Sequence, residues 1–183
     1  MSSRHLSAIA IGLALVVAPV GQTFVWAQTP APTVVSLQAT ISAAARAAAA
    51  VPGFAALSST EKLAAIQEGV AQALATSGAS PEMIAAALIA AVKSGIISAG
   101  VAIAVAASVA PQFAQMVAND PAVVAQLAAT GQSATVTGAT SAGGSVSVLV
   151  SLQGAAGGGG GGPGVAPAAY DPCAGVIAAY CGS

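Results

Sequence analysis

Charged side chains are scarce along this chain. Its 183 residues include 4 lysines and arginines and 5 aspartates and glutamates, which gives a formal net charge of −1. A protein that binds nucleic acid typically neutralises about 6 to 10 phosphates with basic side chains. This chain has too few basic residues to do so, and the same shortage weakens attraction to an anionic membrane surface. We therefore expect neither a nucleic-acid partner nor electrostatic attachment to lipid headgroups.

The residues that most often carry catalysis are nearly absent. The only histidine is His5, and the only cysteines are Cys173 and Cys181, whose spacing matches no zinc site. Histidine is the usual general base near neutral pH and the commonest metal ligand. Ser59 and Lys62 fit a serine-lysine pattern, but its accompanying motifs are missing and a helix start explains both residues better. We expect no enzyme activity, metal or cofactor. A small secreted enzyme that uses Ser59 and Lys62 is an alternative hypothesis, beside the two functions given at the end of this section.

Aromatic residues make up 3% of the chain, whereas 56% of it is hydrophobic, mostly alanine and valine. Alanine favours helix and buries little surface, so a core built from it is thin and lets backbones approach closely. Such a chain removes its apolar surface from water only if its helices pack together, if copies of it assemble, or if it contacts lipid.

The N-terminal residues have the pattern of an export signal. Arg4 and His5 give a short positive start, residues 6–20 are apolar, and Val25–Ala27 offers small residues where a signal peptidase cuts. The sequence predicts a signal peptide over residues 1–27, and hence a secreted, periplasmic or cell-surface protein. The alternative is an N-terminal membrane helix that is retained.

Start and stop signals predict an alanine-rich helical domain over residues 34–131, after a flexible lead-in at 28–33. Apolar residues recur at spacings of three and four, as on one face of a helix. The capping residues Ser58, Ser80 and Asp120, prolines at first helical positions and terminal glycines divide the domain. Four helices follow, with starts near Val34, Ser58, Ser80 and Asp120, and with stops near Pro52, Gly78, Gly95 and Gly131.

The stretch between the third and fourth predicted helices is ambiguous. Residues 95–110 carry no charge. As a helix they would span about 24 Å, less than the roughly 30 Å of a hydrocarbon core. Burial within the protein is one interpretation, and lipid insertion of residues 84–110 is another. A strand is the third, because Val101, Ile103 and Val105 alternate with alanine.

Beyond Gly131 the apolar period changes from helical to alternating. Residues 133–153 predict a β-hairpin, in which Val146, Val148, Val150 and Leu152 share one face. No charge or proline protects its second strand, and an isolated hairpin is marginal in water. We expect its apolar face to cover the helices or its edge to pair with another chain.

Both cysteines and both tyrosines lie in the tail at residues 170–183, behind a Gly/Pro/Ala linker at 154–169. In a continuous helix the Cα atoms of Cys173 and Cys181 would be about 12 Å apart, whereas a disulfide needs roughly 4.4 to 6.8 Å. The tail either bends to form an internal disulfide, which oxidising conditions favour, or links to another chain, or has a redox or ligand role. On a tethered tail, Tyr170 and Tyr180 would be exposed candidates for contact with a partner.

The sequence thus predicts a mainly α fold: a small Ala-rich helical bundle followed by a β-hairpin, a Gly-rich linker and a short Cys-containing tail. The predicted function is that of an exported, non-enzymatic structural or interaction protein of the cell envelope or extracellular space. It would associate with itself or with an envelope or extracellular protein. A membrane-inserting protein acting through residues 84–110 is the alternative.

Overall fold

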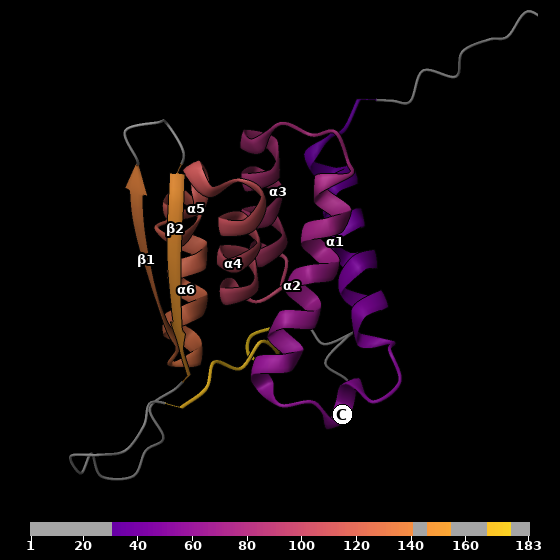
Figure 1. Ribbon diagram of the computed structural model, residues 1–183, viewed down its shortest axis with the longest axis vertical. Coiled ribbons are helices and arrows are strands. Elements are labelled where there is room, and N and C mark those ends of the chain that lie inside the picture. The colour runs from indigo at the N-terminus through magenta and orange to yellow at the C-terminus, as the bar shows by residue number, and fades with distance from the viewer. Residues whose placement is uncertain (1–30, 141–145, 155–167, 177–183) are drawn as a thin grey trace, which may run out of the picture. The chain divides into compact units, whose positions relative to one another are not determined.

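The computed structural model describes residues 31–140, 146–154 and 168–176 (Figure 1). The predicted signal peptide, half of the lead-in, residues 141–145 of the predicted hairpin, most of the linker and residues 177–183 lie outside this part. The described chain is mainly helical, and an antiparallel two-stranded hairpin follows the helices, so the predicted fold class is confirmed. The elements are α1 (Val34–Ala49), η1 (Phe54–Ala56), α2 (Ser59–Ala75), α3 (Pro81–Lys93), α4 (Ala99–Val109), η2 (Pro111–Phe113), α5 (Ala114–Ala118), α6 (Pro121–Thr130), β1 (Ser133–Thr140) and β2 (Val146–Gln153).

The predicted capping residues form the helix starts. The Ser58 side chain accepts a hydrogen bond from the Glu61 amide, and the Glu61 carboxylate accepts one from the Ser58 amide. Ser80 caps α3 and Asp120 caps α6, each followed by a proline at the first helical position. These side chains satisfy amides that have no partner within the first turn. The four predicted helices are therefore present as α1, α2, α3 and α6.

The ambiguous apolar segment forms the centre of the core. Residues 99–109 are the helix α4, and Ala99 to Ala106 are all buried. Helices α2, α3, α5 and α6 pack against α4, and β2 covers it as well. A helix that is apolar on every side needs such a complete cover. Burial in protein is thus the observed state, and the strand alternative is wrong.

Short elements that the sequence did not predict follow α4. Pro111 ends the helix, and the 3₁₀ turn η2 leads into α5, whose Ala114 and Val117 are buried. Among the residues that the structure describes, no helix combines the length and apolar character needed to cross a bilayer.

The hairpin covers the helical core with one face, as predicted. The register runs from Ser133 opposite Gln153 to Thr140 opposite Val146. Strand β1 contacts α5 and α6, whereas β2 contacts α4 and η2. The side chains packed against the core are Ala134, Val136, Val148, Val150 and Leu152. Leu149, on the opposite face, is 74% exposed.

Candidate functional site

Tyr170 is buried against the N-terminus of α4. It is only 4% exposed, and its hydroxyl accepts a hydrogen bond of 2.7 Å from the Gly100 amide. Gly100 leaves the space for the ring, because a Cβ atom there would lie 2.3 Å from Tyr170 Cζ. The exposure expected for Tyr170 is therefore wrong, while Tyr180 lies outside the described residues.

Two glutamines near the C-terminal end of α6 hold the backbone of the tail. Gln126 Nε2 donates to the Gly175 carbonyl, and Gln132 Nε2 donates to the Asp171 carbonyl, both at 3.0 Å. Within the tail, the Cys173 amide donates to Asp171 Oδ1 at 2.9 Å. Residues 168–176 are thus docked on the helical domain, so the expectation of a merely tethered tail is wrong for this part.

The docked tail and α6 together cap α4. The cap residue Ser98 makes no side-chain hydrogen bond to the first turn. Instead, the Ala99 amide donates to Gln126 Oε1 and the Gly100 amide donates to the Tyr170 hydroxyl. Burial raises the pKa of Tyr170 above its ordinary value of 10.0, and the Ser98 hydroxyl and the Gly100 amide partly oppose that rise.

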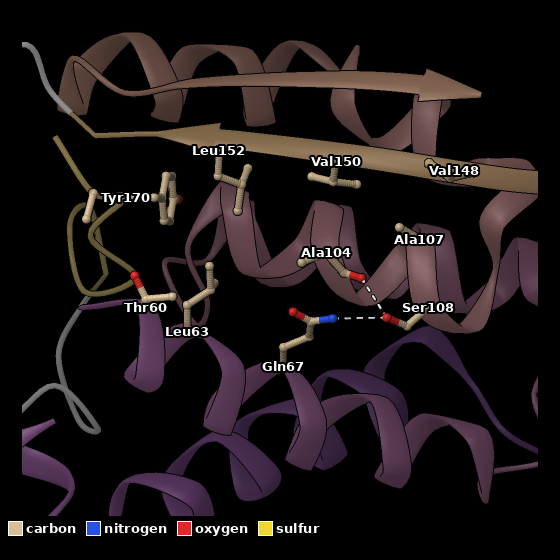
Figure 2. A pocket seen from close by; sticks show the side chains of 11 residues that line it. Thr60, Leu63, Gln67, Ala104, Ala107, Ser108, Val148, Val150, Leu152 and Tyr170 are labelled. Carbon is tan, nitrogen blue, oxygen red and sulfur yellow. Dashed lines mark hydrogen bonds between the residues drawn. The ribbon is translucent and has the colours of Figure 1, made fainter. Parts of the chain in front are cut away.

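A groove with a volume of about 480 Å³ lies beside β2 (Figure 2). Helix α2 forms one wall, α4 contributes small side chains, β2 forms the other wall, and the tail closes one end. The lining residues are Thr60, Leu63, Gln67, Ala104, Ala107, Ser108, Val148, Val150, Leu152, Ala169 and Tyr170. Gln67 Nε2 donates to Ser108 Oγ at 3.0 Å, and Ser108 in turn donates to the Ala104 carbonyl at 3.0 Å.

The groove lining favours binding over catalysis. None of its residues is an aspartate, glutamate, lysine, arginine, histidine or cysteine. The tyrosine hydroxyl is already engaged at the start of α4, so the lining supplies no nucleophile with an adjacent base. Its volume, and walls that combine apolar side chains with uncharged polar groups, are compatible with binding an uncharged ligand.

A second hollow of about 360 Å³ lies between α1 and α2. It contains one carboxylate, Glu68, among alanines, Val51, Phe54 and Leu57. A Cβ atom at Gly69 would lie 3.5 Å from Ala48 Cβ, which is ordinary van der Waals contact, so the two helices are already closely packed there. The hollow is therefore a packing seam with a single acid and no partner for acid-base chemistry.

The remaining predicted site residues are only partly covered by the structure. Cys173 is half-buried in the docked tail, and Cys181 lies outside the described residues, so the Cys173–Cys181 disulfide stays a prediction. Lys62 lies with its Nζ atom 5.9 Å from the centre of the Phe54 ring, and Ser59 begins α2. Within residues 31–140, 146–154 and 168–176, no group of three or more histidines, cysteines, aspartates or glutamates could hold a metal ion.

Sequence reasoning did not identify Gly100, Gln126 or Gln132. A glycine inside an apolar helical pattern often has a packing reason, and that was the signal available for Gly100. The two glutamines have no such signal, because their partners lie 39 to 49 residues away.

No family model, curated protein or solved structure matches this chain. The function therefore has to be inferred from the chemistry of the groove, the strand beside it and the docked tail.

Proposed function

We propose that this protein is an exported, non-enzymatic structural or interaction protein of the cell envelope or extracellular space. It holds protein partners, including copies of itself, in the groove beside β2. The observation that supports this most is the groove itself, whose walls carry no charged side chain and whose rim is a strand of a two-stranded sheet. The export pattern of residues 1–27 supports the location.

Protein segments suit this groove better than a small polar substrate does. A polar substrate needs several placed donors or charges, whereas the polar side chains here are Thr60, the Gln67–Ser108 pair and the engaged Tyr170. An extended peptide can satisfy its own backbone groups on a strand and place apolar side chains against α4.

Membrane insertion finds less support from the fold. It would use residues 84–110, but Ala99 to Ala106 are covered by protein on every side. Exposing them would mean dismantling the core. We therefore do not favour this alternative.

Site-specific photo-crosslinking in the native host tests the proposal. A photoreactive amino acid replaces Ser108 in the groove, and a matched control replaces Ala64, which is exposed and does not line the groove. We expect the mature chain outside the cytoplasm and a crosslink to protein from position 108 but not from 64. Retention of residues 1–27 in the cytoplasm, or equal crosslinking from both positions, would contradict the proposal.

A further inference from the structure

Strand β2 has one edge that no other strand covers in the part of the chain that the structure describes. The sheet contains β1 and β2 only within these residues, so each strand pairs on one side. Side chains from β2, and none from β1, line the groove, and α2 forms the opposite wall (Figure 2). The unpaired edge of β2 is thus the edge beside the groove.

The backbone groups on that edge can be assigned from one hydrogen bond. The Gly154 amide, directly after β2, donates to the Ala168 carbonyl of the tail at 2.8 Å, so it points away from β1. Backbone groups of successive residues in a strand point to opposite sides. Counting back in steps of two, the N–H and C=O groups of Leu152, Val150 and Val148 therefore point toward the groove.

The tail already places a backbone against this edge at one point. A Cβ atom at Gly154 would overlap the Ala169 carbonyl, so the tail runs directly along the end of β2. It then turns away, since the Asp171 carbonyl accepts from Gln132 beyond the end of α6. The edge can hence take an extended backbone, and the stretch from Val148 to Leu152 is left for one from another chain.

Helix α2 limits that addition to a single strand. A second added strand would overlap α2, which excludes a hairpin or the edge of a folded sheet. The groove side of α2 carries uncharged polar groups instead (Figure 2). Gln67 donates to Ser108 through Nε2, while neither Gln67 Oε1 nor the Thr60 hydroxyl has a hydrogen-bond partner among the described residues. These groups can bond to the outer edge of one added strand.

The lining also sets the composition of the added strand. Its inward side chains would lie over Ala104 and Ala107 of α4, next to Leu63 of α2. A charged side chain would lose hydration there without finding a partner, because no lining residue is charged. The edge from Val148 to Leu152 is about 13 Å long at roughly 3.3 Å per residue, which matches about five residues.

Building on the proposed function, we infer that the partner segment bound in this groove is a lone extended stretch of another protein. It consists of about five uncharged residues with apolar side chains at alternate positions, and it adds one strand to β2. Its inner edge bonds to Val148, Val150 and Leu152, and its outer edge meets Gln67. Such a segment is a chain end or an extended loop.

Affinity selection with short peptides tests this inference. The mature chain is immobilised and exposed to a library of end-capped five-residue peptides built from alanine, valine, leucine, serine and threonine. Ser108→Arg places a charge in the groove from an exposed position, and the matched control Ser151→Arg adds the same charge on the exposed outer face of β2. Circular dichroism confirms that both variants fold.

We expect the wild type and the control to retain the same peptides, in which apolar residues alternate with serine or threonine. Ser108→Arg should bind these peptides at least about tenfold more weakly. Gln67→Leu keeps the size of the side chain but removes the partner of the outer edge, so it should weaken binding about threefold or more.

Nuclear magnetic resonance titration with the retained peptides locates the added strand. The amide signals of Val148 and Val150 should shift strongly, because these groups face the groove. The amides of Leu149 and Ser151 should shift little, because they point to β1.

The inference is overturned if the wild type retains no peptide more strongly than Ser108→Arg does, or if Gln67→Leu leaves binding unchanged. Shifts that are larger at Leu149 and Ser151 than at Val148 and Val150 also overturn it. None of these results removes the proposed function, which crosslinking from positions 108 and 64 decides. A protein crosslink from position 108 without peptide retention would therefore reject the lone strand and keep the interaction role.

Discussion

Gly100 and Tyr170 fit each other closely enough for their coupling to be measured. Gly100→Ala places a methyl group where the tyrosine ring lies, since the Cβ–Cζ distance would be 2.3 Å. We expect a loss of about 1–3 kcal/mol in the free energy of unfolding, as for other overpacked sites. In a Tyr170→Ala background the same change should stabilise the protein by roughly 0.5–1 kcal/mol, because alanine favours helix over glycine. Urea unfolding of the four variants measures the cycle, and a cost of equal size in both backgrounds would show that the ring does not occupy this slot.

The Tyr170 hydroxyl also predicts a pH dependence. Burial raises its pKa in the folded state above the ordinary 10.0, so the folded chain favours the protonated phenol. This contribution to stability is complete below pH 10.0 and is lost as the pH rises through the folded-state pKa. As the pH rises from 10.0 toward the folded-state pKa, we expect the unfolding temperature of the wild type to fall more steeply than that of Tyr170→Phe. Tyr180 is present in both proteins, so parallel curves would mean that Tyr170 titrates as an exposed tyrosine.

At the scale of elements, Gln126 joins α4, α6 and the tail, and two substitutions separate its contacts. Gln126→Ala removes the acceptor for the Ala99 amide and the donor to the Gly175 carbonyl. We expect it to cost about 1–3 kcal/mol, since it leaves a part-buried amide without a partner. Gln126→Glu retains an acceptor beside the helix N-terminus, where a negative charge is favourable, but cannot donate to Gly175.

Gln126→Glu should therefore retain most of the stability and release the tail. Urea unfolding reports the first effect, and the rate of proteolysis within residues 168–176 reports the second. If both variants lose stability equally and keep the tail protected, Gln126 acts only through the helix cap.

The elements that the sequence predicted are those with local signals. Each capping side chain lies within three residues of the amide that it caps, as for Ser58, Ser80 and Asp120. The helix starts could therefore be predicted from short stretches of sequence. The hairpin could be predicted from the alternation of its valines, which is typical of a strand with one buried face. In contrast, the contact between Gly100 and Tyr170 spans 70 residues and a glycine-rich linker. The composition predicted a tethered tail, because the glycine-rich linker cannot pack a core. The composition carries no information about where on the domain the tail docks.

At the scale of the whole molecule, the tail belongs to the same folding unit as the helices. It contacts the end of β2 through Ala168, the start of α4 through Tyr170 and the end of α6 through Asp171. These contacts join elements from across residues 98–154, and Tyr170 is part of the hydrophobic core. Because α4 is buried and capped by the tail, opening the tail exposes the Gly100 amide, whereas α2 also keeps its packing against α1.

Native-state hydrogen exchange can show whether the tail and the core open together. In the wild type we expect the Gly100 amide to exchange as slowly as the amide of Val70, which is buried in α2, because both need global unfolding. Tyr170→Ala lowers global stability and accelerates both amides, so the ratio of their rates carries the information. We expect that ratio to rise at least about tenfold, which corresponds to local opening at about 1.4 kcal/mol less than global unfolding. An unchanged ratio would mean that the start of α4 stays closed without the tyrosine, and that the tail rests on a core already complete without it.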